Sequence, residues 1–198
     1  MGAAADPIEV ETRKGRMWAA RSAGASVRRP TRAALGVALA LAAMAGAPGV
    51  WAGPRFAAQP TPAEITGSLS RYGARATVSA LFAQRRWDFV SDRIGAGEAP
   101  YVALAVKLAP GADAGTAEDL PIALAFALPR NAPAVLAVLA APESSFDVAE
   151  VCDAPFIEDT VSDIPAWRRQ AAAAVRRVAD PRLGAVKTAC LAAIESEG

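Results

Sequence analysis

The stretch APAVLAVLAAP at residues 132–142 decides the fold class of this 198-residue chain. It begins with Ala-Pro, continues with apolar residues and ends at a second proline. Proline suits the first turn of a helix but disrupts the hydrogen bonding of its interior, so the stretch predicts a short helix bounded at both ends. A similar stretch, APYVALAVKLAP, occupies residues 99–110, and its Ala-Pro start lies 33 residues earlier.

A third helical stretch, LPIALAFALPRN, lies between these two copies. Paired helices with a period of about 33–34 residues have the size of a tetratricopeptide or ankyrin unit, which needs a stacked neighbour to cover its apolar face. At ALPRNAPAVLAVL, where one helix should end at Pro129 and the next begin with Pro133, the chain loosely resembles the tetratricopeptide family. The family's Trp-Leu-Gly-Tyr pattern is missing from both copies. The resemblance therefore implies helical hairpins without the family's peptide groove.

The composition favours helices throughout. Hydrophobic residues make up 53% of the chain but aromatic residues only 6%, so the apolar surface comes in small units that suit closely packed helices. We expect an all-α fold of about seven or eight short helices, arranged as consecutive antiparallel hairpins in a solenoid-like or irregular bundle with one disulfide. The whole chain resembles the small exported all-helical proteins of bacteria, and this resemblance implies no activity.

Residues 1–52 have the layout of a secretory signal peptide with an upstream extension. From Met17, a basic segment without acidic residues precedes AALGVALALAAMAGA and then PGVWAG. We predict cleavage between Ala52 and Gly53, with Met17 as an alternative start. An uncleaved membrane anchor is the alternative, but the apolar run is short for a bilayer of roughly 30 Å. The expected location is periplasmic or secreted, with no stable membrane insertion after cleavage.

The predicted mature chain consists of a linker at 53–60 and a single helical domain at 61–198. It contains 14 Lys+Arg and 17 Asp+Glu, so it lacks the basic excess of a nucleic-acid-binding domain. Thr61-Pro62-Ala63-Glu64 is a capping box that predicts a helix over 62–72, with Gly73 as its stop. Helical spacing then continues to Gly95, as two short helices or one bent helix.

The two cysteines, Cys152 and Cys190, are expected to pair. Thiols pair in oxidising compartments, and Cys190 recurs with Leu183, Val186 and Ile194 on one apolar helix face. The last helix would then be joined to the loop that contains Cys152. A nucleophilic Cys152 is disfavoured because the sequence EVCDAP surrounds it with acids, which raise the pKa of a thiol. Phe156 and Ile157 are expected to be apolar plugs beside the bridge.

Four arginines flank the apolar stripe of a helix that Ser162 or Asp163 should cap. Arg168, Arg169, Arg176 and Arg177 form either a basic face for a partner or an ordinary solvated face.

No catalytic or metal-binding motif stands out. The chain has no histidine, which removes the usual general base and the commonest zinc ligand. Helix capping by Asp113 or Thr116 explains PGADAGTAEDLP better than a calcium site does, so we expect no metal and no cofactor.

The favoured hypothesis is a non-catalytic envelope protein that works by binding another protein, as a scaffold or as an inhibitor or immunity factor against an envelope-acting effector. The alternative is a carboxylate-based hydrolase of cell-wall glycan, using Glu158-Asp159 or Glu150 with Asp153.

Overall fold

The computed structural model describes residues 53–157 and 161–196, and within these residues the chain forms helices and no strand. The predicted all-α fold is therefore confirmed. The predicted signal peptide, Ala52 included, lies outside the described residues. The elements are α1 (Pro62–Ala83), α2 (Trp87–Gly95), α3 (Ala99–Val102), α4 (Ala105–Leu108), η1 (Ala109–Gly111), α5 (Ala114–Ala127), α6 (Ala132–Leu139), α7 (Val148–Cys152), α8 (Ile164–Arg176), η2 (Pro181–Leu183) and α9 (Gly184–Glu195).

α1 begins where the capping box in the sequence predicts a helix start. Thr61 Oγ1 accepts a hydrogen bond from the Glu64 N–H (3.3 Å), and Glu64 Oε2 accepts one from the Thr61 N–H (2.7 Å), which is the predicted capping box. Gly73 has φ 79° and ψ 170°, a conformation essentially reserved for glycine, so the helical backbone is interrupted there, at the predicted stop, and the chain bends. The helix resumes after this bend and continues to Ala83.

The two similar stretches fold differently. Residues 132–139 form the single helix α6, capped by Asn131, whose side chain accepts a hydrogen bond from the Ala134 N–H. Residues 99–111 instead divide into α3, α4 and η1. Because α3 packs on α2 and α6 while α4 packs on α1, one straight helix would not reach all three neighbours. The sequence repeat is therefore not a structural repeat.

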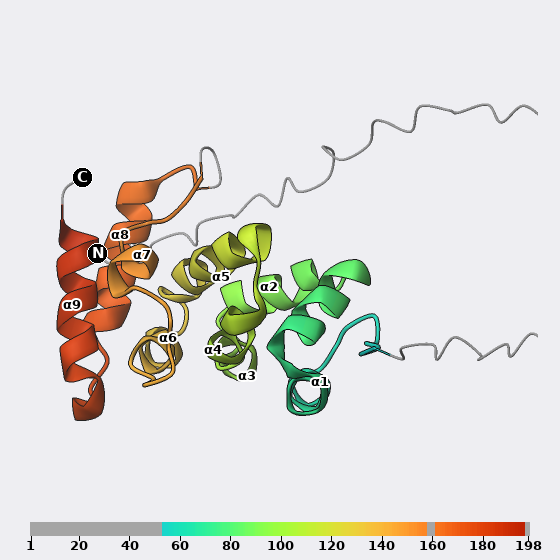
Figure 1. The fold of residues 1–198 in the computed structure, drawn as a ribbon. Coiled ribbons are helices and arrows are strands. Elements are labelled where there is room, and N and C mark those ends of the chain that lie inside the picture. Colours follow the sequence, from blue (N-terminus) through green and yellow to red (C-terminus); the bar gives the residue numbers. More distant parts are fainter. Residues whose placement is uncertain (1–52, 158–160, 197–198) are drawn as a thin grey trace, which may run out of the picture. The chain divides into compact units, whose positions relative to one another are not determined.

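Helix pairing does not simply follow chain order. α2 packs on α5, and α7 and α8 both pack on α9, while α1 contacts α4 and η1. Consecutive antiparallel hairpins are thus not confirmed. α1 and α9 lie at opposite ends of the unit formed by residues 51–198 (Figure 1). α1 and α9 therefore present separate surfaces at the two ends of this unit.

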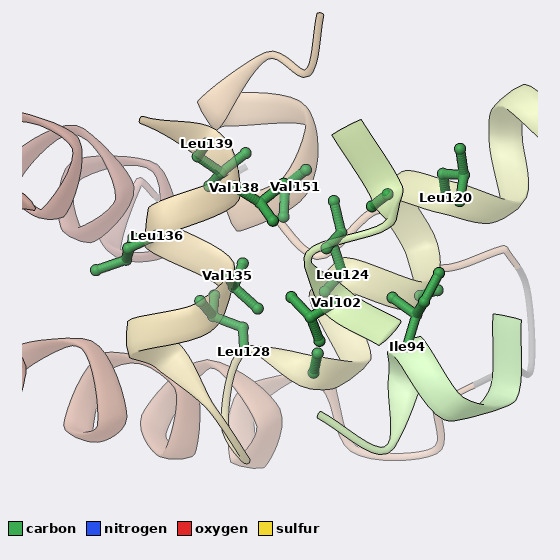
Figure 2. Close-up of a cluster of buried hydrophobic side chains, with 14 of the residues drawn as sticks. Ile94, Val102, Leu120, Leu124, Leu128, Val135, Leu136, Val138, Leu139 and Val151 are labelled. Carbon is green, nitrogen blue, oxygen red and sulfur yellow. The ribbon is translucent and has the colours of Figure 1, made fainter. Parts of the chain in front are cut away.

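The core is built from aliphatic side chains of modest size (Figure 2). Leu124, Leu128 and Val135 are fully buried and lie together with residues of α2, α3 and α7, whereas Leu136, also fully buried, points from the opposite side of α6. Each such side chain stabilises the fold by roughly 1.5–3 kcal/mol when it leaves water. Many small contributions of this kind add to those of the buried aromatic residues Trp87, Tyr101 and Trp167.

Residues 53–60, expected as a linker, lie against the domain. We call this segment the strap. Both hydrogen-bonding groups of the Gln84 amide engage it: the side-chain NH₂ donates to the Pro54 carbonyl (2.8 Å), and Oε1 accepts from the Phe56 N–H (3.0 Å). The Tyr101 hydroxyl donates to the Pro60 carbonyl (2.9 Å), and both prolines are buried. The strap is therefore fixed at both ends.

Candidate functional site

The disulfide forms as predicted. Cys152 and Cys190 are bonded, with their Cα atoms 5.4 Å apart, and both side chains are fully buried. The bridge joins the last residue of α7 to the middle of α9. The sequence predicts Cys152 in a loop, whereas the structure places it in a helix. The difference arises because Asp147 accepts a hydrogen bond from the Ala149 N–H (2.7 Å) and so caps a short helix around Cys152.

Of the two predicted plugs beside the bridge, Phe156 is partly buried against the core and Ile157 is exposed. The Phe156 ring lies 5.0 Å from the Trp167 ring and 4.7 Å from the Phe126 ring, centroid to centroid. Ile157 is 62% exposed, so its prediction is wrong. Consecutive side chains of a non-helical segment point to opposite sides, and only one of the two can face the core.

The four arginines of α8 do not act as one face. Arg168 donates to Asp153 Oδ1 (2.6 Å) and to the Ile194 carbonyl at the end of α9 (2.7 Å). Arg176 pairs with Glu195, also on α9. Arg169 and Arg177 are exposed. Half of the predicted partner-binding face therefore holds α8 to its neighbours, because helical spacing alone cannot tell which flank a second helix covers.

Arg168 gives a first testable expectation. Its guanidinium ties α8 to both α7 and α9, whereas the adjacent Arg169 is exposed. Arg168→Met should lower the free energy of unfolding by about 1 kcal/mol, since charge-assisted hydrogen bonds to two elements are lost. Arg169→Met is the matched control, with an expected change within about 0.5 kcal/mol. Urea unfolding followed by circular dichroism measures both, and equal effects would contradict this role for Arg168.

Among the described residues, the acidic side chains considered for catalysis, Glu150 and Asp153, line neither of the two hollows described below. Asp153 is paired with Arg168, Glu150 is exposed on α7, and Glu158-Asp159 lie outside the described residues. At the start of α5, Thr116 Oγ1 accepts a hydrogen bond from the Asp113 N–H (2.8 Å) and donates one to Asp113 Oδ1 (2.9 Å), which confirms the capping interpretation. Asp119 accepts from the Trp87 indole N–H (2.8 Å). Each of these bonded carboxylates thus has a local structural role.

Two open hollows flank the first half of α1. The first, which we call the strap hollow, has a volume of about 460 Å³ and lies between the strap and α1. Its walls are the backbone of Gly53 and Pro54 with side chains from both segments, namely Arg55, Glu64, Ser68, Arg71 and Tyr72. Gly67 contributes no side chain, which keeps the wall open there. The lining combines two arginines with one carboxylate.

The second hollow, which we call the Leu69 hollow, has a volume of about 370 Å³ on the other flank of the same helix. Leu69, Ala74 and Val106 give it an apolar floor, and Lys107 and Glu143 stand at its edge. Each hollow contains one carboxylate, whereas glycoside hydrolysis by the common mechanisms requires two. Neither therefore has the donor set of that reaction.

Exposed aromatic side chains also gather on α1. Tyr72 is 41% exposed and Phe82 is 65% exposed, and Phe82 stands two turns beyond Arg75 on the same side of the helix. Arginine, tyrosine and phenylalanine are the residues most enriched in protein interfaces. α1 thus carries two hollows, exposed aromatic rings and arginines on one element.

The distribution of charge along the sequence also marks this surface. Residues 53–87 contain five arginines and a single acidic residue, whereas residues 88–198 contain 9 Lys+Arg and 16 Asp+Glu. The near-neutral total conceals this separation. Charge counted by segment would have pointed to α1 and not to α8.

Comparison with protein-family models, with curated proteins and with solved structures gave no match. Among the helices of residues 53–157 and 161–196, none combines the length and the hydropathy that crossing a membrane requires.

Proposed function

We propose that this chain is an exported, non-catalytic protein of the bacterial envelope that works by binding another protein through α1. The disulfide is the observation that best supports the proposed export. A buried bridge between two distant helices persists in an oxidising compartment and is rare where glutathione keeps thiols reduced. The signal-like N-terminal segment supports the same location.

The composition of the α1 surface supports binding. Hot spots of protein interfaces are rich in tyrosine and arginine, and they insert into or surround hollows. Tyr72 and Arg71 line one such hollow, and Phe82 projects from the same helix. A scaffold role and an inhibitor or immunity role both use a surface of this kind, and the strap is bonded to Gln84 at the end of α1.

Processing can be tested directly. The full chain, produced in a bacterium with a C-terminal affinity tag, should be recovered from the periplasm or medium with Gly53 as its first residue. Denatured but unreduced protein should contain no free thiol, because Cys152 and Cys190 are bonded. Mass spectrometry and thiol titration measure both. Recovery from the cytoplasm with an intact N-terminus and two free thiols would refute the export.

Partner binding through α1 can be tested by site-specific photo-crosslinking. A photo-crosslinking amino acid in place of Tyr72 or Phe82 should give one discrete adduct with another envelope protein. The same amino acid at Thr188, an exposed residue of α9 at the other end of the unit, is the matched control. Equal labelling at all three positions, or none at α1, would contradict α1 as the binding surface.

A further inference from the structure

We propose that cleavage after Ala52 completes a carboxylate-binding site in the strap hollow, where the new α-ammonium group of Gly53 joins Arg55 and Arg71. The site rests on the proposed function, because it requires export and cleavage. It also specifies the partner's chemistry, since the ligand would be an acidic side chain of the partner protein. The unprocessed chain has an uncharged peptide nitrogen at Gly53. Processing would thus add one positive charge at the lip of the hollow.

The strap holds this N-terminus in place. Pro54 is buried, and the Gln84 amide bonds to the backbone on both sides of Arg55, at the Pro54 carbonyl and the Phe56 N–H. Gly53 is therefore one residue away from a fixed point. A terminal ammonium tethered this closely loses little freedom on binding, which favours affinity.

The single carboxylate of the hollow is engaged elsewhere. Glu64 Oε2 accepts hydrogen bonds from the Thr61 N–H (2.7 Å) and the Thr61 hydroxyl (2.9 Å). The bond from the Thr61 backbone, and to a smaller extent the bond from the Thr61 hydroxyl, lower the pKa of Glu64. Glu64 therefore stays charged, and its carboxylate is bonded to the start of α1. The processed hollow would then hold three cations against one anion.

A carboxylate fits these walls better than a lipid phosphate. The arginines stand in a hollow with Tyr72 and Ser68 beside them, and a projecting side chain can enter it. A flat bilayer surface cannot follow a concave wall. Arginine binds carboxylates and phosphates alike through two parallel hydrogen bonds, so the shape of the hollow is what favours a projecting side chain.

The first experiment varies only the terminal charge. Residues 51–198 form a compact unit of their own, so chain 53–198 is prepared with a free and with an acetylated amino terminus. The probe is fluorescein-labelled hexaglutamate, with hexaglutamine as its control, at about 20 mM ionic strength, where charges are least screened. Acetylation should weaken hexaglutamate binding about fivefold, the effect of one exposed ion pair.

A pH series sharpens this test. The groups that surround the terminal amine are Arg55 of the strap and Glu64, Arg71 and Tyr72 of α1. An α-amino group loses its proton near pH 8. Binding by the free-amine chain should weaken as the pH rises through this range. Binding by the acetylated chain should stay constant.

The second experiment blocks the hollow from within. An added Cβ at Gly67 meets no atom within 4 Å, so Gly67→Glu fits and places a carboxylate one turn before Arg71. This variant should reduce hexaglutamate binding at least fivefold by occupying the arginines. Gly67→Gln is the matched control, since it has the same size without the charge, and it should reduce binding less than twofold.

Equal hexaglutamate affinity of the free and acetylated chains, or no detectable binding by either, would overturn the proposal. So would stronger binding to phosphatidylglycerol vesicles than to hexaglutamate, which would assign the arginines to a membrane, or full competition by millimolar inorganic phosphate. These results differ from failure of the proposed function, which is measured by export and by crosslinking at Tyr72 and Phe82. A chain can pass those tests and still lack this site.

Discussion

Removal of the Cys152–Cys190 bridge is expected to lower the free energy of unfolding by about 4 kcal/mol. The bridged residues are 38 positions apart, and the chain-entropy model assigns roughly this value to a loop of that length. A typical domain is stable by only about 5–15 kcal/mol, so the loss is a large share of the total. α7 has five residues and cannot form a stable helix alone. Its amides should therefore lose their protection from hydrogen exchange first.

The double variant Cys152→Ala with Cys190→Ala is the clean test, because both sites are buried and alanine leaves no unpaired polar group. Guanidinium unfolding of this variant is compared with that of the unaltered chain, with and without reductant. Reductant should destabilise the unaltered chain and leave the double variant unchanged. A loss below about 1 kcal/mol would show that packing between α7 and α9, and not the bridge, holds this end together.

Helix ends were the most predictable part of the fold. Each capping side chain lies within three residues of the group that it bonds. This holds for Thr61 with Glu64, for Asp113 with Thr116, and for Asp163 at the start of α8. Such bonds depend on local sequence alone, so a single sequence is enough to recognise them. The disulfide was equally accessible, because a chain with two cysteines allows one internal pairing.

Features that depend on distant neighbours were missed. The strap looks like a linker in the sequence, and its partners Gln84 and Tyr101 stand about 28 and 41 residues away from the atoms they bind. Arg168 looks like its neighbour Arg169 until α9 is placed beside it. Both cases require knowledge of which segments meet, and periodicity describes one segment at a time. The candidate site consists mainly of contacts of this kind.

Gly111→Ala is expected to destabilise the fold by about 3 kcal/mol, which is at the upper end for a single added methyl group in a packed interior. A Cβ at Gly111 would lie 2.3 Å from the Ala74 carbonyl carbon, 2.4 Å from its oxygen and 2.6 Å from the Arg75 nitrogen. All three are backbone atoms of α1 just after the bend at Gly73. They cannot move aside as a flexible side chain can, so η1 and α1 would have to separate.

Separation of η1 from α1 should also be visible at the surface. Ala74 and Pro110 line the Leu69 hollow from these two elements, so Gly111→Ala should alter crosslinking from α1 as well as stability. Gly115→Ala is the matched control, because an added Cβ there meets no atom within 4 Å and alanine favours the helix α5 by up to about 1 kcal/mol. Thermal and urea unfolding of both variants measure the difference. A neutral Gly111→Ala would mean that α1 and η1 are not in the close backbone contact that positions both hollows.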